Sequence, residues 1–442
     1  MYIYNLNKNN GSTMRIKIEK LLTGIIVVSL FVSFFIGALT VRGIGTSVND
    51  SSFSVPNLSA QGKFWPGDSS EWTEVAWQTQ GIDPDKIAEM FEFINSSKTD
   101  IHSIVIARNG YLLLEEYLLN YQIYRNLTGH KVYSNGNTTH IQQSTTKSVM
   151  SVLIGIAIQE GFLDNVNQTL YEFYADIWNS TFTDSEQKKS ITIEQLLTHN
   201  SGLNGGDANY PPNGKTLIEL DCIGWALDRV PLKYNPGQTG VYEYSSDGPN
   251  LLSGIIENVT GKSTEKFAQE YLFTPLGISE DEYYWWHDDK NVSFGGYGLD
   301  CTPKVQAKFG ILCLNDGKWD GTQIVEPNFM EDALTQQTSA MGMPYGYLFY
   351  IRDDPFDAYF TIGAGGQNIY ILPEYNIVVG FTASNGGPYE QIISDYILKN
   401  IVDPPSIPDD PIIPGFDFNI LFLTIFCASA VLIIRRKKTS KN

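Results

Sequence analysis

The fold is decided by residues 141–158, IQQSTTKSVMSVLIGIAI, where a serine and a lysine three positions apart open a continuously apolar run. A run of this length that is apolar on every side predicts a buried helix from Ser144 to about Gly161. The S-x-x-K spacing puts the Ser144 hydroxyl and the Lys147 amine on one face of that helix, one turn apart. Because an unpaired lysine beside a buried helix is costly, the pair indicates chemistry as well as packing.

This pair has the properties of an activated nucleophile. The N-terminus of a helix favours negative charge near the Ser144 hydroxyl. Burial disfavours the charged form of Lys147, so its amine can act as a base.

The S-x-x-K spacing occurs twice more, at Ser185/Lys188 and Ser263/Lys266. The first copy lies in the polar run TFTDSEQKK, and the second opens an ordinary amphipathic helix. We therefore predict structural roles for both.

Two later segments supply the rest of a candidate active site. Tyr244, in residues 242–261, can relay a proton between a nucleophile and a leaving group. The alternative is packing, since the chain has 25 tyrosines and most must serve the core. In residues 362–371, IGAGGQNIYI, a glycine run enters a strand, which lets backbone N–H groups approach a substrate carbonyl. A tight turn is the alternative there.

Around these segments the chain reads as strands, then helices, then strands. Residues 83–97 have helical periodicity, residues 103–117 form two strands joined by an Asn-Gly turn, and residues 164–289 are mostly helical. Further strands are predicted at Tyr345–Arg352, Ala358–Ile362, Asn368–Leu372 and Ile377–Ala383. This order predicts an α+β fold, an antiparallel sheet flanked by helices with an inserted, mostly helical subdomain. A doubly wound parallel sheet would need regular strand–helix alternation, which is absent.

The three segments, in this order, resemble those of the serine β-lactamase and penicillin-binding-protein-like hydrolases. More narrowly, they resemble the class C β-lactamase-related branch, with its esterases and 6-aminohexanoate-oligomer hydrolases. Residues 193–203, 272–278 and 307–321 are similar to that branch as well. The resemblance implies a β-lactamase/transpeptidase-like fold.

The resemblance also implies roles for individual residues. Ser144 would be the nucleophile, Lys147 its base, and Tyr244 the tyrosine of the family's Y-x-N element, aligned through Glu257 and Gly261. The third position of that element is Ser246 in place of asparagine, which puts the usual amide contact to substrate in doubt.

The third element departs further from the family pattern. The family's K/H-[TS]-G falls on Gly363-Ala364-Gly365, so the cation that helps hold a substrate carboxylate is missing. This argues against β-lactam or cell-wall peptide substrates and for esters or amides without that carboxylate. The resemblance implies an oxyanion hole made of the backbone N–H groups of Ser144 and Gly366.

Four further residues are candidate substrate contacts. Ser246, Gly365 and Gln367 belong to the elements just described, and Trp286 lies in the aromatic cluster of residues 283–288. Aromatic side chains supply apolar pocket walls with polar tips. Core packing explains the aromatic cluster equally well.

Other catalytic chemistries find no support in the chain. His199 could be a triad histidine, but no G-x-S-x-G elbow is present, and a structural role is predicted for it. No HExxH, P-loop or dinucleotide fingerprint is found, so neither a metal site nor a cofactor is predicted.

Composition narrows the class of protein. The chain has 442 residues and a net charge of −19, without the basic footprint that a nucleic-acid partner requires. Its four cysteines are Cys222, Cys301, Cys313 and Cys427, and no pair has CxxC spacing. Cys301 and Cys313 are either a disulfide pair or small buried thiols.

Both ends of the chain read as membrane segments. The predicted order is a cytoplasmic N-terminus (1–20), a transmembrane or signal-anchor helix (21–41), a stalk (42–70), the folded domain (71–401), a Pro/Asp-rich spacer (402–415), a C-terminal transmembrane helix (416–434) and a basic cytoplasmic tail (435–442). A cleaved signal peptide is the alternative at the N-terminus.

The basic residues flanking both apolar segments place the domain between them outside the cytoplasm. Between the two apolar segments lie nine N-x-[ST] sequons, which fit an outward-facing glycoprotein: Asn49, Asn57, Asn95, Asn126, Asn137, Asn167, Asn179, Asn258 and Asn291. We expect a membrane-bound, extracellular serine hydrolase that acts on a small-molecule or peptide-like ester or amide. The alternative function is a non-catalytic binding or receptor domain on the same fold.

Overall fold

The structure is a computed structural model that describes residues 64–118, 139–204 and 221–401. The two predicted membrane segments, the predicted tails and spacer, and most of the predicted stalk lie outside these ranges. Within them, no helix is both long and apolar enough to cross a membrane.

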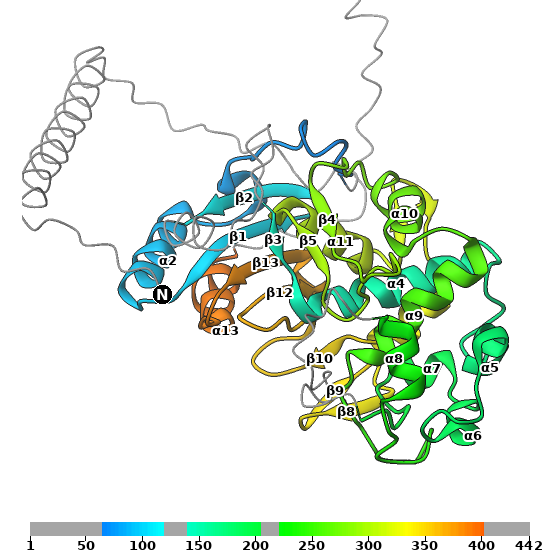
Figure 1. The fold of residues 1–442 in the computed structure, drawn as a ribbon. Helices are drawn as coiled ribbons and strands as arrows, with labels where there is room; N and C mark the ends of the chain where they lie inside the picture. Colours follow the sequence, from blue (N-terminus) through cyan, green and yellow to red (C-terminus); the bar gives the residue numbers. More distant parts are fainter. Residues whose placement is uncertain (1–63, 119–138, 205–220, 402–442) are drawn as a thin grey trace, which may run out of the picture. The chain divides into compact units, whose positions relative to one another are not determined.

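An antiparallel sheet of eight strands forms the centre of the domain (Figure 1). Its spatial order is β2-β1-β13-β12-β11-β10-β9-β8. The bounds are β1 Ile101–Arg108, β2 Tyr111–Tyr117, β8 Thr338–Ala340, β9 Met343–Tyr345, β10 Tyr350–Arg352, β11 Ala358–Phe360, β12 Asn368–Leu372 and β13 Ile377–Ala383. The first and last strands of the sequence, β1 and β13, therefore lie side by side, as the second and third strands from one edge of the sheet.

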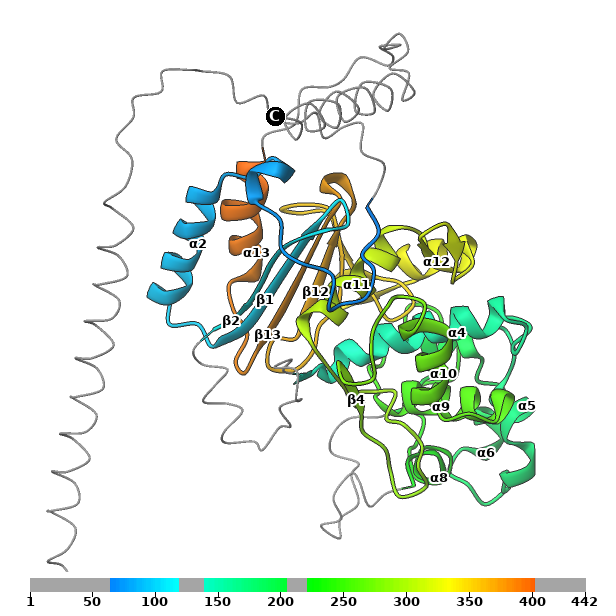
Figure 2. The ribbon, with the colours of Figure 1, turned by 90° about the horizontal axis from the view of Figure 1, so that it is seen from above.

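Helices cover both faces of this sheet (Figure 2). Helix α2 (Pro84–Ser96) packs on one face together with α13 (Tyr389–Gln391) and the π-helical turn η9 that continues it (Ile392–Ile397). Helix α11 (Pro303–Leu314) packs on the other face. Successive side chains of β13 point to opposite faces of the sheet. Val379 packs in the core on the α2 side, and its neighbour Val378 packs in the core on the α11 side.

The remaining helices lie on the α11 side, and all of them except α6 contribute residues to one core cluster with α11. They are α4 Thr146–Gln159, α5 Leu170–Tyr174, α6 Ser185–Lys188, α7 Ile193–Leu197, α8 Cys222–Asp228, α9 Asp247–Thr260, α10 Thr264–Ala268 and α12 Pro327–Leu334. A three-stranded sheet β3-β5-β4 (His140–Ile141, Leu299–Cys301 and Tyr283–Trp285) and the hairpin β6-β7 (Lys318–Trp319, Thr322–Gln323) complete the described part. The predicted α+β architecture is confirmed.

The predicted hairpin turn and the predicted start of the first helix are confirmed, because turn and capping residues mark both. The turn between β1 and β2 is Asn109-Gly110, and both residues have positive φ, 53° and 83°, as a two-residue hairpin turn requires. Asp83 accepts a hydrogen bond from the N–H of Asp85 and so caps α2, which has Pro84 at its first position.

The single predicted strand Tyr345–Arg352 is wrong. Strand β9 ends at Tyr345 and β10 begins at Tyr350. The residues between form a tight turn in which Gly346 N–H donates to Phe349 O at 2.9 Å and Leu348 has a φ of 61°. Leu348 N–H also donates to Leu197 O, so docking on α7 interrupts the strand.

The suggested Cys301–Cys313 disulfide is also wrong. Both thiols are free and buried, one on β5 and the other on α11, as is Cys222 on α8. Burial raises the pKa of each of these thiols. The alternative, small buried thiols, is the correct one, and Cys427 lies outside the described residues.

Candidate active site

The predicted nucleophile lies at the start of the buried helix, as the sequence indicates. Ser144 belongs to a 3-10 turn, η3 (Gln143–Thr145), that leads directly into α4. The neighbouring Thr145 hydroxyl donates to Gln367 O at 2.7 Å and lies 2.9 Å from the Thr361 hydroxyl. These contacts fix the start of the helix against the ends of β11 and β12.

The three predicted catalytic side chains meet at the hydroxyl of Ser144. Lys147 Nζ lies 3.0 Å from Ser144 Oγ, and Tyr244 OH donates to the same oxygen at 2.5 Å. Lys147 Nζ also lies over the Tyr244 ring, 4.8 Å from its centroid. Lys147 is buried whereas Tyr244 is 37% exposed, so the group opens to solvent on the tyrosine side.

Two further oxygens hold the amine of Lys147. Nζ donates to the Ser246 hydroxyl at 3.1 Å and to the Gly296 carbonyl at 2.5 Å. Ser246, which replaces the asparagine of the family's Y-x-N element, therefore contacts the lysine. Its predicted contact with substrate stays a prediction.

Gly296 is a site residue that sequence reasoning missed. Its N–H donates to the side chain of buried Asn250, on α9, at 3.0 Å. A Cβ atom at Gly296 would lie 2.7 Å from Ser246 O, so only glycine allows this approach. The pair Gly295-Gly296 in an otherwise aromatic segment was the signal that could have found it.

His199 packs directly behind Tyr244. The two ring centroids are 4.8 Å apart, and Ser245 N–H donates to His199 Nδ1 at 3.4 Å. Burial lowers the pKa of His199 well below its usual value, with a smaller contribution from nearby Lys147. The ring is therefore neutral and has no direct contact with the Ser144 hydroxyl, in agreement with the predicted structural role.

The glycine run of residues 363–366 forms a tight turn between β11 and β12, next to the nucleophile. A Cβ atom at Gly363 would lie 2.3 Å from Gln142 O, which shows how closely the turn approaches the segment before Ser144. Gly366 N–H donates to Gly363 O at 3.0 Å. The predicted oxyanion donor is thus occupied in this structure, and Gly366 can act as predicted only if the turn releases that bond.

The predicted substrate contact by Gln367 is not supported by the geometry. Its side chain is 2% exposed and bonds backbone groups only. Nε2 donates to Ala364 O at 3.0 Å and to Ala383 O at 2.8 Å, while Oε1 accepts from Ala383 N–H at 3.1 Å. Gln367 therefore holds the glycine turn on β13 and is not available to a substrate.

Gly365 and the glycine turn line a cavity of about 580 Å³. Its walls include Phe360 and Tyr370, which contact the core on the α2 side, and Ser144 is not among its lining residues. Thr361, the residue after Phe360, contacts Thr145 instead. By strand alternation, the cavity opens on the face of the sheet opposite the nucleophile.

The aromatic cluster of residues 283–288 divides between two roles. Tyr283 and Trp285 are buried in the core, as the packing alternative holds. Trp286 is half-buried, and its indole N–H donates to Asp300 Oδ2 at 2.8 Å. Its predicted contact with substrate stays a prediction.

The other two S-x-x-K pairs have structural roles, as predicted. Lys188 Nζ donates to Ala226 O and Leu227 O at the end of α8, and Ser185 accepts from the Trp178 indole. Ser263 caps α10. In neither pair does the lysine amine bond the serine hydroxyl among the described contacts, and Ser263 Oγ accepts only from the backbone N–H of Lys266 at 3.4 Å. Across the described ranges, no group of three or more His, Cys, Asp or Glu could hold a metal ion.

Comparison with known proteins places this geometry in context. A family model described as "Beta-lactamase" matches residues 103–400. The chain is 22% identical over 261 residues to the 6-aminohexanoate-dimer hydrolase of Paenarthrobacter ureafaciens, covering 54% of this chain and 64% of that protein. It is 25% identical over 298 residues to the lovastatin esterase of Penicillium rubens, covering 53% and 72%. The match thus spans less than two thirds of the first relative's length.

Solved structures share the fold. A putative 6-aminohexanoate-dimer hydrolase from Bacillus anthracis superposes with a TM-score of 0.54 at 20% identity, over 70% of this chain and 80% of that chain. At this level of identity the similarity establishes the architecture, and the site must be judged on its own residues.

Proposed function

Because this chain belongs to the Beta-lactamase family, we propose that it is a serine hydrolase that cleaves an ester or amide through an acyl-enzyme. The observation that carries the proposal is the convergence of Lys147 Nζ and Tyr244 OH on the Ser144 hydroxyl. A nucleophile within hydrogen-bond distance of both a base and a proton donor is the arrangement that covalent catalysis requires.

The hydrogen bonds around Lys147 suit a general base. In its neutral form the amine has two N–H groups and one lone pair. The two N–H groups donate to the Ser246 hydroxyl and the Gly296 carbonyl. The lone pair is then free to accept the proton of the Ser144 hydroxyl. Tyr244 can donate to Ser144 Oγ at the same time, so both groups act on the hydroxyl together.

The reaction follows from these contacts. Ser144 loses its proton to Lys147, its oxygen bonds to the substrate carbonyl carbon, and the carbonyl electron pair moves onto oxygen. Collapse of this intermediate breaks the bond to the leaving group, which takes the proton of Lys147 through Tyr244, so that Lys147 is neutral again. Water then attacks the acyl carbon and gives a proton to Lys147; the bond between that carbon and Ser144 Oγ breaks, and Ser144 takes the proton back from Lys147.

The oxyanion requires N–H donors near Ser144. The first turn of a helix has N–H groups without partners inside the helix, which supports the Ser144 N–H as one donor. Within the glycine turn, the N–H groups of Ala364 and Gly365 donate to no backbone carbonyl in the described chain. We assign the second donor to one of these two, or to Gly366 after release of Gly363 O.

The substrate class follows from the missing cation. No lysine or histidine stands at residues 363–365, so a substrate carboxylate finds no partner at the position where the family provides one. A relative named as an esterase and another named as a dimer hydrolase support an ester or an amide as the bond that is cleaved. In this proposal the scissile carbonyl enters from the exposed side of Tyr244.

We place the domain outside the cytoplasm, anchored through the apolar segments 21–41 and 416–434. The five sequon asparagines within the described ranges, Asn95, Asn167, Asn179, Asn258 and Asn291, are all exposed, which supports an outward-facing glycoprotein. Asn258 differs from the others because its amide donates to Phe173 O at 2.6 Å.

Hydrolysis of p-nitrophenyl esters by the purified full-length chain tests the proposal. Replacing the nucleophile, Ser144→Ala, should lower kcat by roughly 10³- to 10⁶-fold and leave the circular dichroism spectrum unchanged. Ser185→Ala, at another S-x-x-K serine, is the matched control and should retain activity. Undiminished turnover in a folded Ser144→Ala protein would overturn the assignment.

A further inference from the structure

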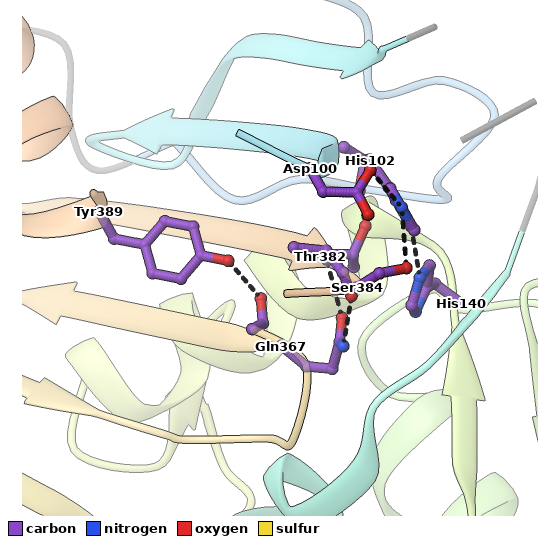
Figure 3. A network of polar contacts seen from close by, with 10 residues as sticks. Asp100, His102, His140, Gln367, Thr382, Ser384 and Tyr389 are labelled. Atoms are coloured by element: carbon purple, nitrogen blue, oxygen red, sulfur yellow. Dashed lines mark hydrogen bonds and ion pairs between the residues drawn. The ribbon is translucent and has the colours of Figure 1, made fainter. Parts of the chain in front are cut away.

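Two buried histidines contact each other, and one of them contacts Ser384 (Figure 3). His102, on β1, and His140, on β3, are 1% and 2% exposed. His102 Nδ1 lies 2.9 Å from His140 Nε2. A direct hydrogen bond between two imidazole rings requires one nitrogen to donate and the other to accept.

The outer contacts of the pair fix which nitrogen donates. His140 Nδ1 lies 3.0 Å from Ile141 O, which can only accept, so Nδ1 carries a proton. In a neutral ring His140 Nε2 must then accept, and His102 Nδ1 must donate. His102 Nε2 lies 3.2 Å from the Ser384 hydroxyl, which can either donate or accept. Burial lowers the pKa of His102, while Asp100, 3.5 Å from Nε2, opposes that shift.

One end of this chain of hydrogen bonds supports the glycine turn. Ser384 follows Ala383, whose backbone is bonded on both sides by the Gln367 amide. Two residues later, Gly386 N–H donates to Gly365 O at 2.7 Å. The Tyr389 hydroxyl completes the support by donating to Gly366 O at 2.9 Å.

The other end lies four residues before the nucleophile. His140 O accepts from the Gln142 side chain at 2.7 Å, and the Gln142 carbonyl lies against Gly363. His140 is therefore tied both to Ser384 through His102 and to the backbone that leads into Ser144.

We propose that His102 and His140 are positioning residues for the hydrolase reaction: their hydrogen bond sets the spacing between the glycine turn, which receives the oxyanion, and the Ser144 nucleophile. The inference rests on the proposed function. Neither His102 nor His140 contacts the substrate in this proposal. It requires only that the two halves of the site be held together through Ser384, His102 and His140.

Four histidine variants of the full-length chain test this inference. His102→Leu and His140→Leu each remove the inter-ring hydrogen bond. His140→Gln keeps an acceptor, because a glutamine Oε1 can take the position of Nε2. His287→Gln is the matched control, at a half-buried histidine whose described hydrogen bond is to Trp285 O.

The readouts are kcat and KM for p-nitrophenyl butyrate, with kcat divided by the number of sites that a fluorophosphonate titrates. Misplacing the oxyanion donors should lower kcat by roughly 10- to 100-fold in both leucine variants with KM within about threefold. His140→Gln should recover most of that loss, and His287→Gln should match the wild type. A purely structural role would lower the number of titratable sites and leave kcat per site unchanged.

Ser384→Ala keeps the test decisive if the leucine variants do not fold. The wild type and this variant differ by one hydroxyl at the wall of the cavity, and we expect kcat per site to fall a few-fold. The inference is overturned if folded leucine variants have the kcat per site of the wild type, or if Ser384→Ala has the kcat per site of the wild type. A folded wild type that never reacts with the fluorophosphonate overturns the proposed function, and the inference with it.

Discussion

At the scale of single residues, the hydrogen bond from Tyr244 to Ser144 Oγ carries most of the proposed mechanism. Removing it with Tyr244→Phe should lower kcat/KM by roughly 10²- to 10⁴-fold, the usual contribution of one general acid–base group. Tyr242→Phe, two residues away and also in ring contact with His199, is the control and should leave kcat/KM within a few-fold. Equal rates for the two variants would exclude Tyr244 from the proton transfers. Stopped-flow hydrolysis of p-nitrophenyl esters provides the measurement.

The glycine turn gives a second prediction at this scale. A Cβ atom at Gly366 would lie 2.2 Å from the Tyr389 hydroxyl, at a φ of 105° that side chains rarely adopt. Gly366→Ala should therefore displace the turn and lower kcat by at least about tenfold. Gly386→Ala has a similarly positive φ of 74° but open space around it, so it isolates the backbone strain. If Gly366→Ala and Gly386→Ala lower kcat equally, the close contact between Gly366 and the Tyr389 hydroxyl does not explain the loss.

How far the site could be predicted also depends on residue chemistry. Ser144, Lys147 and Tyr244 were predictable because their side chains carry the reaction and stand in recognisable patterns. Gly296 was missed because it acts through its carbonyl, which every residue type possesses. Gln367 was assigned to substrate because an amide next to a glycine turn looks available. Its burial depends on how β12 pairs with β13, which spacing alone does not contain.

At the scale of elements, capping decides where α2 begins. Asp83→Ala removes the carboxylate that accepts from Asp85 N–H and should destabilise the domain by about 1 kcal/mol. Asp85→Ala, also exposed and in the first turn, keeps the cap and should cost less. Urea unfolding followed by tryptophan fluorescence measures both. Equal losses would mean that charge near the helix start matters and the cap does not.

The bounds of helices and strands were predicted best where a turn or capping sequence marks the end of the element. The Asn109-Gly110 turn and the Asp83-Pro84 start carry their own geometry, and the bounds of β12 and β13 agree with the prediction. The break between β9 and β10 was missed, because it arises from Leu348 docking on α7, a contact between residues about 150 positions apart. Short strands such as β3 and β5 were missed for the same reason.

At the scale of the whole molecule, the buried lysines link stability to pH. Burial lowers the pKa of Lys188 from 10.5 to about 8 in the folded domain. Between these values the unfolded chain binds more protons, so this group makes folding more favourable as pH rises from about 8 to 10.5. Compared with Lys188→Met, the wild type should therefore gain relative stability across that window. The measurement is the difference between the urea midpoints of the wild type and Lys188→Met, taken at pH 7 and again at pH 10. If this difference is the same at both pH values, the pKa of Lys188 is not shifted.

The order of the chain explains why the site forms only in the complete fold. β1 and β13 pair within the sheet, although they are separated by the whole helical region that carries Ser144 and Tyr244. The glycine turn reaches the nucleophile only after this pairing is made. The sequence predicts the two layers and the insertion from the order of elements, whereas the register that brings Gly363 against Gln142 is visible only in the structure.

The most direct test of the central claim is to locate the adduct of a fluorophosphonate on the intact, full-length chain by peptide mass spectrometry. The account predicts one adduct, on Ser144, that is absent in Ser144→Ala while Ser185→Ala and Ser263→Ala are labelled like the wild type. A folded wild type without an adduct, or an adduct that persists in Ser144→Ala, would contradict the claim that Lys147 and Tyr244 activate this serine.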